Sequence, residues 1–546
     1  MALLQSSKLK IGFYLKFKFL EIFLNIFAFY IFTLFYFFSL NGYGKLLLSF
    51  VFNKNIYFNP FEISLFGLIF NLIAGYLLYF TFGFNSYLNL IFLLLGIVLF
   101  YFLFEKKDIK YIFKYGFFIL LFFSLVIISK THEDFPSYHF QSIRDIFENK
   151  LTFGGANIDL RFAHASLFIF VQSFSIVPYF FYKFIHVSVF ITYFCLLGYF
   201  YYQSKISRIN KLENLFCNFL LIILIIKFTR LSEYGYDYIS QFLLLIVFHK
   251  ALFRKKDIIE IYKSLLIFIF AILIKPVAIL FFPVFLILLY KNNIKELFLK
   301  ISKKFLVIFI LLQIIFLSNS FIRTGCIFYP LNSTCFSKDT INWGVKDDLK
   351  GYSNMVQLWA KGYYHQDKSK YEEKLPEKKF KDNYNWIKYW IDIHFFYKIS
   401  EFLLIIISIF IVFLISIIRV ELSSLLYKSK ELSISILLSF LSIFLWLNFS
   451  PDFRFGFAAL LIFTFCIFIF FFKKDFFFIE KRMKIFLCLA ILFFNIKNFN
   501  RIYKEFNRED HFQFKNFPWF SNHSLDIDIS KFRIEDYGYY RIIYRL

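Results

Sequence analysis

The chain has 546 residues, of which 59% are apolar, and its mean hydropathy is +0.63. Soluble chains of this length usually form several domains and contain about 45–50% apolar residues. Here the apolar excess is concentrated in runs such as residues 90–104, 402–418 and 432–447, which excludes a soluble multidomain enzyme, a disordered chain and a secreted disulfide scaffold. We predict an all-α integral membrane protein that crosses the membrane many times.

The net charge of +25 need not indicate a nucleic-acid partner, because membrane proteins concentrate Lys and Arg on the cytoplasmic side. Six short segments between apolar runs hold 24 Lys and Arg against 9 Asp and Glu, and we expect them in the cytoplasm: 105–114, 203–213, 250–261, 291–304, 419–430 and 473–484. Four other segments hold 18 against 17, and we expect them outside: about 130–162, 229–237, 321–394 and 449–455.

This alternation requires two irregular segments in the first half of the chain. Residues 163–179 must form a re-entrant or interfacial helix broken at Pro178, and residues 261–290 must contain two short spans that meet at Lys275 and Pro276. The count is then about 14 spans (range 11–14). We predict a membrane domain over residues 1–496 and an outward-facing tail over 497–546. The amino terminus falls outside, although four lysines between residues 8 and 18 favour the cytoplasm.

The first outward segment carries adjacent carboxylates, Glu133 and Asp134, directly after an apolar run. Carboxylates at the membrane boundary are costly unless they are partnered or hydrated, so they are candidates for a functional site. Pro136 can begin a short helix that directs one of them over the bundle. The alternative is that both acids only complement the dipole of that helix.

Cations are placed at the ends of several outward segments. Arginine suits the bidentate binding of phosphate or carboxylate, and with the two acids these cations predict a site for a lipid-linked phosphate or pyrophosphate. The alternative is that each cation pairs locally or contacts lipid headgroups. The candidates are Arg161, Arg230, Arg323, Arg454 and Lys275; Tyr138, His139 and Tyr236 are candidates for orienting a sugar.

Cys326 and Cys335 both lie in the third outward segment, where an oxidising environment allows a disulfide, although two free thiols are an alternative. Metal signatures are absent from the sequence. His132, Asp134 and His139 can gather around a divalent cation, but hydrogen bonding or helix capping explains each of them as well.

Several of these motifs together resemble a family of uncharacterised bacterial multi-spanning membrane proteins. The motifs are Glu133 to His139, Asn157 with Arg161-Phe162, His164-Ala165-Ser166, Glu233-Tyr234-Gly235, Thr324 to Pro330 and Phe453 to Gly456. The likeness covers about residues 60–475. That family in turn resembles the GT-C superfamily of membrane glycosyltransferases, which use a polyprenyl-phosphate sugar and carry an acidic residue in the first large outward loop, near interfacial helices.

The resemblance implies a GT-C-like fold and a sugar transfer at the outer face of the bacterial cytoplasmic membrane. Asp134 or Glu133 would be the catalytic acid-loop residue, and the cations at the boundary would bind the donor phosphate. Two departures matter: Glu133-Asp134 is not a full Asp-x-Asp, and no large soluble outward domain for acceptor recognition is evident beyond residues 321–394 and the tail.

Three other functions stay open at this stage: a transporter or flippase of lipid-linked saccharides, a polymerase or ligase of such saccharides, and a non-catalytic scaffold. Transport of polar cargo requires ionisable residues along a path through the membrane. The predicted spans are nearly free of charge apart from Lys275, which favours chemistry at the surface.

Overall fold

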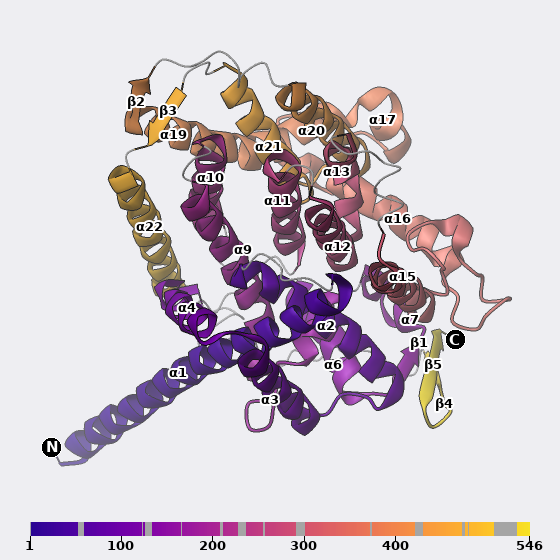
Figure 1. Cartoon of the computed structure of the whole chain (residues 1–546). Helices are drawn as coiled ribbons and strands as arrows, with labels where there is room; N and C mark the ends of the chain where they lie inside the picture. Colours follow the sequence, from indigo (N-terminus) through magenta and orange to yellow (C-terminus); the bar gives the residue numbers. More distant parts are fainter. Residues whose placement is uncertain are drawn as a thin grey trace.

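The computed structural model is built mainly of helices (Figure 1). It describes residues 2–52, 59–122, 124–125, 134–164, 166–207, 211–227, 236–254, 257–290, 301–371, 374–420, 430–471, 475–478, 480–506 and 532–545. Glu133 and Arg230 lie outside the described residues, as does most of the predicted tail.

Nine helices in this described part are long and apolar enough to cross a membrane. Their apolar stretches are Phe23–Phe52 of α1 (Ala2–Phe52), α2 (Pro60–Thr81), α3 (Ser86–Leu103), Tyr182–Ile206 with α9 (Val187–Ile206), α15 (Lys303–Thr324), Trp386–Ile411 across α18 and α19, α20 (Lys430–Phe449), Phe453–Phe470 of α21 (Phe453–Phe471) and Arg482–Lys504 of α22 (Glu480–Phe506). Three more helices, α10 (Lys211–Lys227), α11 (Asp237–Phe253) and α12 (Ile258–Ile274), have 17 residues each, near the lower limit for a span. The prediction of a multi-pass all-α membrane protein is confirmed at this level.

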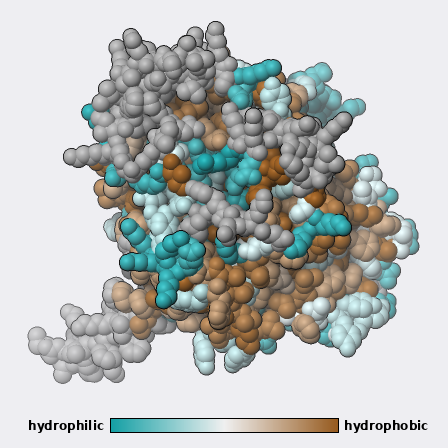
Figure 2. Space-filling view, viewed as in Figure 1, coloured by the Kyte–Doolittle hydropathy of each residue, from teal (hydrophilic) through white to brown (hydrophobic). Residues whose placement is uncertain are grey.

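The outer surface of the bundle is apolar, as a lipid-facing surface requires. α3 exposes Ile91, Leu94 and Val98 while it buries Gly96 and Phe100. Figure 2 shows hydrophobic residues forming a broad continuous patch on one face of the molecule. On its buried side α3 crosses α1 closely, because a Cβ on Gly96 would lie 2.0 Å from the Ser39 hydroxyl oxygen.

Two helices are interrupted where the sequence predicts irregular segments. α8 (Phe168–Ser173) has only six residues, too few to cross a membrane, and Pro178 follows it in irregular chain. α12 ends before Lys275 because Pro276 disfavours the helical conformation of the residue that precedes it; Lys275 has φ −148° and ψ 109°. The chain then continues as η5 (Pro276–Phe281) and α13 (Phe282–Tyr290).

Two small sheets lie at opposite corners of the view (Figure 1). β1 (Leu151–Phe153) pairs in parallel with β5 (Tyr540–Arg545), which pairs antiparallel with β4 (Phe532–Asp536). The end of the chain therefore docks on the first predicted outward segment. β2 (Ile417–Val420) and β3 (Asp475–Phe478) pair with each other; β2 overlaps the start of the predicted cytoplasmic segment 419–430, and β3 lies within the predicted segment 473–484. α22 continues past residue 496 to Phe506.

A buried network of four charges joins α2, α11 and α12. Lys250 contacts Glu62 at 2.7 Å and also Glu260, and Lys263 contacts Glu260 at 2.7 Å and Glu62 at 3.4 Å. Both lysine side chains are only 1% exposed. We call these four residues the Glu62 network. Beside it, Glu213 contacts His249 at 3.0 Å and Arg254 at 2.8 Å.

These contacts add charged residues to the predicted spans, because Glu62 lies in the first turn of α2 and Lys263 in the second turn of α12. Lys250 lies in the last turn of α11 and Glu260 in the first turn of α12, so much of the predicted cytoplasmic loop over 250–261 is helical. A lysine near the end of an apolar run has the same sequence pattern whether it is solvated in a loop or paired inside the bundle. The positive-inside rule therefore cannot distinguish the two cases.

We predict that Glu62→Ala destabilises the protein strongly, because it leaves two buried lysines with one carboxylate. The expected loss is about 3–5 kcal/mol. It would be measured as a lowered unfolding temperature of the purified chain in detergent. Glu105→Ala is the matched control, because the Glu105–Lys107 pair is more than two-thirds exposed, and it should leave the unfolding temperature nearly unchanged. Equal unfolding temperatures for the two variants would contradict the assignment.

Candidate functional site

Asp237, the first residue of α11, joins cations from two distant parts of the chain. Its carboxylate lies 2.8 Å from the Lys275 ammonium and 3.2 Å from the Arg454 guanidinium. Lys275 is placed there by the break between α12 and η5, and Arg454 by the first turn of α21. The Asp237 side chain is buried, whereas Lys275 and Arg454 stay partly exposed.

Arg454 forms a second ion pair, with Asp452, in addition to its ion pair with Asp237. A cation in the first turn of a helix is unfavourable next to the positive end of the helix dipole, so Arg454 needs such partners. Asp452 lies 3.5 Å from Arg454 and 3.7 Å from Lys398. Burial raises the pKa of Asp452, but Arg454 and Lys398 outweigh burial and lower this pKa below its usual value. Asp452 is therefore a carboxylate at neutral pH.

Aromatic rings enclose the two cations. The Arg454 guanidinium lies 5.2 Å from the centroids of both Trp359 and Phe455, and the Lys275 ammonium lies 5.5 Å from that of Phe455. Trp359 belongs to α16 (Lys346–Ala360), in the long predicted outward segment. That segment therefore folds back onto the start of α21, and the Trp359 ring restricts the orientation of Arg454.

The first outward segment reaches the same place through a short π-helix, η2 (Phe135–His139), which continues as α6 (Phe140–Glu148). Asp134 comes directly before η2 and is partly exposed. Its charge acts on Tyr138, His139 and Arg454, and so does the charge of Asp237. The acid motif and the Asp237 contacts thus share one electrostatic environment.

Burial makes the two side chains of this segment neutral at physiological pH. Burial raises the pKa of Tyr138 well above its usual value, and the nearby Asp134 and Asp237 add to this effect. Burial and the neighbouring Lys275 lower the pKa of His139 to about 3. Neither residue adds a charge to the site, so both are suited to hydrogen bonding.

Arg161, in η3 (Leu160–His164), borders the site next to Tyr138. Its guanidinium lies 5.8 Å from the Tyr138 ring and is bound by Asp159, at 2.7 Å for the shortest of the contacts between the two residues. The charge of Asp134 also acts on Arg161 and on Tyr352. Arg161 is therefore part of the site and is about one-third exposed.

Arg323 lies in the last turn of α15, and its side chain is buried. Its Nε donates to the Asn319 side-chain oxygen at 3.3 Å, and its charge acts on Tyr236. Tyr236 donates to Gln172 and packs its ring 4.8 Å from that of His139. Arg323 is thus linked to the site indirectly, because its charge acts on Tyr236 and the Tyr236 ring packs against His139.

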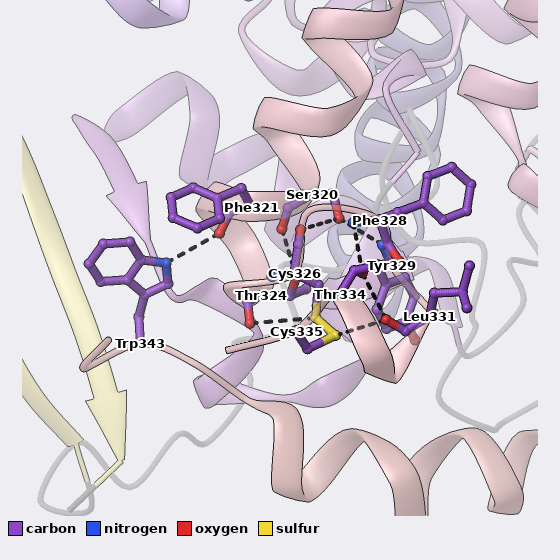
Figure 3. The surroundings of a disulfide bond; sticks show 10 residues. All are labelled: Ser320, Phe321, Thr324, Cys326, Phe328, Tyr329, Leu331, Thr334, Cys335 and Trp343. Atoms are coloured by element: carbon purple, nitrogen blue, oxygen red, sulfur yellow. Dashed lines mark hydrogen bonds between the residues drawn. A yellow bond between two sulfur atoms is a disulfide. The ribbon is translucent and has the colours of Figure 1, made fainter. Parts of the chain in front are cut away.

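A disulfide between Cys326 and Cys335 closes the loop that follows α15 (Figure 3). The Ser320 hydroxyl donates to the Cys326 carbonyl at 2.8 Å and accepts from the Tyr329 amide at 3.0 Å. The Tyr329 hydroxyl lies 3.0 Å from His164 Nε2. The loop therefore brings Tyr329 to η3 and connects the long outward segment with the first one.

The structure brings together most of the predicted site residues that it describes. Tyr138, His139, Lys275 and Arg454 interact with Asp237, Asp134 and Arg161 lie next to Tyr138, and Tyr236 and Arg323 lie in the next layer. We call Asp134, Tyr138, His139, Asp237, Lys275, Asp452 and Arg454 the Asp237 cluster. The sequence analysis did not select Asp237, Asp452 or Trp359. The available signal for the two acids was their position at the start of an apolar run.

In the described part of the chain, no group of three or more His, Cys, Asp or Glu is arranged to hold a metal ion. The fold and this cluster define a multi-pass helical membrane protein with a charged site built from broken helices and interfacial segments. The model of a domain of unknown function, DUF8201, matches residues 24–461, so the chain belongs to that family. No curated protein and no solved structure shows significant similarity to it.

We predict that the protein loses stability as the pH falls below about 6.5. His139 has a folded pKa of about 3, as does His164, whose pKa is lowered by burial and by Lys275. Between pH 6.5 and 3 the unfolded chain binds protons that the folded chain excludes, so each histidine contributes up to about 1.4 kcal/mol per pH unit. The measurement is the unfolding temperature at pH 7.5 and pH 5.0.

The variant His139→Gln should weaken this pH dependence, and His139→Gln combined with His164→Gln should weaken it further. Each variant is compared with the native protein at both pH values, so that a uniform loss of stability is separated from a changed slope. An unchanged slope in the double variant would show that these histidines are not buried in the neutral form.

Proposed function

We propose that this protein is a GT-C-like membrane glycosyltransferase. It transfers a sugar from a polyprenyl-phosphate donor to a cell-envelope glycan, lipid or protein acceptor at the outer face of the bacterial cytoplasmic membrane. The observation that supports this proposal best is the convergence of Lys275 and Arg454 on Asp237, beside the Asp134 segment. The GT-C-like fold, with about 14 spans, and the outward orientation belong to the same proposal.

The cations of the site fit a phosphodiester. Among the described residues, each cation in or next to the cluster is paired with a carboxylate: Arg161 with Asp159, Lys275 with Asp237, Lys398 with Asp452, and Arg454 with both Asp237 and Asp452. A polyprenyl-phosphate sugar carries one negative charge on its phosphodiester. Lys275 and Arg454 are partly exposed, so they can bind that phosphate while Asp237 keeps them in position.

In this mechanism the acceptor hydroxyl attacks the anomeric carbon of the donor. The bond between that carbon and the phosphate oxygen breaks, and polyprenyl phosphate leaves with the electron pair. Asp134 accepts the proton of the hydroxyl, with Glu133 as the alternative acid. Asp237 and Asp452 are each held by two cations and are buried, whereas Asp134 is partly exposed, so Asp134 is the carboxylate that an acceptor can reach. Lys275 and Arg454 stabilise the charge that develops on the phosphate.

A transporter or flippase is the second candidate, and one observation favours it. The Glu62 network places ionisable residues inside the bundle, as transport pathways do. Its two carboxylates and two lysines are paired and buried, however, which supports a structural role. A polymerase or ligase of lipid-linked saccharides shares the site chemistry of a glycosyltransferase and differs in its acceptor.

We predict that Asp134→Asn lowers the turnover of a labelled polyprenyl-phosphate sugar about 10²–10⁴-fold, because it removes the base. Glu133→Gln is assayed in parallel, and Asp348→Asn is the control because its carboxylate is exposed on α16. Protein in membrane vesicles is assayed for release of polyprenyl phosphate and for product. Full activity of both Asp134→Asn and Glu133→Gln would eliminate the mechanism.

We also predict that Arg454→Lys weakens donor binding more than its retained charge suggests, because lysine cannot form the two-sided contact with Asp237 and Asp452. The expected change is a loss of at least tenfold in donor affinity, measured by binding of the labelled donor without acceptor. Binding without any product from the native chain would instead support a scaffold or a transporter.

A further inference from the structure

The described part of the chain ends in a hairpin of two strands that lies beside β1 (Figure 1). β5 lies between β1 and β4 and pairs in parallel with β1, so that Arg541 is opposite Thr152. We call β4 and β5 together the C-terminal hairpin. The match to the family model ends at residue 461, before this hairpin begins, so membership of the family gives the hairpin no role.

Arg541 joins the C-terminal hairpin to three residues of the first outward segment. Its guanidinium group donates to the Asp145 carboxylate at 2.5 Å, to the Asn149 side-chain oxygen at 3.1 Å and to the Thr152 hydroxyl at 2.8 Å. The Arg541 and Asp145 side chains are only 21% and 28% exposed, so their charge-assisted contact is shielded from water. Because Asp145 lies in α6 and Thr152 in β1, a single side chain fixes the end of α6 relative to the hairpin.

A second set of contacts holds the turn that follows β1. The Asn157 side-chain amide donates to the carbonyls of Ile543 in β5 and of Trp343, both at 3.1 Å. Gly154 has φ 76°, and a Cβ at this position would lie 2.2 Å from the Ile543 carbonyl oxygen. Glycine therefore permits both the left-handed turn and the close approach of β5. The hairpin thus contacts both ends of the stretch 145–157.

This stretch connects two parts of the candidate site. On its amino-terminal side, α6 continues η2, so Asp145 lies within two helical turns of His139. On its carboxyl-terminal side, the chain enters η3, which carries Arg161. A shift of the stretch 145–157 would therefore move both the Asp134 segment and Arg161. Lys275 and Arg454 come from other elements and are held by Asp237.

We infer that the C-terminal hairpin positions the Asp134 segment and Arg161 against the cations of the Asp237 cluster, and that Arg541 is the positioning residue through which it acts. Without this contact, the acid and the cations that bind the donor would no longer be held in one arrangement. The expected effect on turnover rests on the proposed glycosyl transfer. The expected effect on the geometry of the first outward segment does not.

The first test needs no substrate and measures modification of His139 by diethyl pyrocarbonate, located by mass spectrometry, in the full chain in detergent. His139 is 7% exposed, so it should react slowly in the native protein. Arg541→Ala should raise its rate about tenfold or more, because the end of α6 is then released and opens locally. His249, which is 0% exposed in α11, should stay protected in the same sample and so exclude general unfolding.

Arg144→Ala is the matched control, because the ion pair of Arg144 with Glu148 stays within α6, and it should leave the reactivity of His139 unchanged. Equal protection of His139 in the native protein and in Arg541→Ala would overturn the inference, and so would equal reactivity of His139 in the two arginine variants.

The second test compares turnover with donor binding in membrane vesicles, using the labelled polyprenyl-phosphate sugar. Arg541→Ala should lower the release of polyprenyl phosphate about 10–100-fold, as a misplaced base does. Donor affinity should change less than about twofold, because Lys275 and Arg454 keep their places. Arg541→Lys keeps the charge beside Asp145 and should restore part of the turnover. An equal fall in turnover and donor affinity would reduce Arg541 to a general structural role and overturn the inference.

A crosslink tests the docked hairpin directly. Leu151 and Tyr540 are paired residues of β1 and β5, and strands lie about 4.8 Å apart, within the Cα range of a disulfide. Leu151→Cys with Tyr540→Cys, added to Arg541→Ala and oxidised, should restore the protection of His139. Failure of the crosslink to form, or a crosslinked chain in which His139 still reacts, would overturn the inference. Absence of turnover by the native chain would contradict the proposed function alone, since the protection of His139 still decides the role of the hairpin.

Discussion

The ion pairs of Asp237 with Lys275 and Arg454 are the contacts on which the candidate site depends. They join the start of α11, the break after α12 and the start of α21, three points that are far apart along the chain. Irregular backbone at membrane depth is tolerated only where protein or water satisfies it. A buried carboxylate between two cations is stable only while all three groups stay together, so the charges fix how these helix ends meet.

Further contacts position the segments around the ion pairs of Asp237. Asp452 fixes Arg454, Trp359 and Phe455 flank the guanidinium, and η2 brings Tyr138 and His139 beside them. The turn before α21 is itself held by two indoles, since Trp390 donates to the Pro451 carbonyl and Trp446 to the Asp452 carbonyl, both at 2.7 Å. Rigid aromatic side chains thus transmit the packing of α18 and α20 to the position of one arginine.

The helices and the two irregular segments could be predicted because they depend on local properties. Apolar runs of sufficient length predict spans, and Pro276 predicts the break at Lys275. The meeting of Asp237 with Arg454 could not be predicted, because 217 residues separate them and no local pattern encodes their contact. The local pattern around Lys250 predicts a cytoplasmic loop, yet this lysine lies in the last turn of α11 as a buried ion-pair partner.

Accessibility distinguishes the two groups of ions. The Glu62 network pairs two carboxylates with two lysines, and both lysines are almost fully buried, so it has neither spare charge nor access for a ligand. In the Asp237 cluster, the carboxylates of Asp237 and Asp452 are buried. The side chains of Lys275, Arg454 and Asp134 remain partly exposed. Evenly paired, inaccessible ions stabilise the bundle. Cations that stay accessible can bind an anion, which is why the proposed function is placed at the Asp237 cluster and a structural role is given to the Glu62 network.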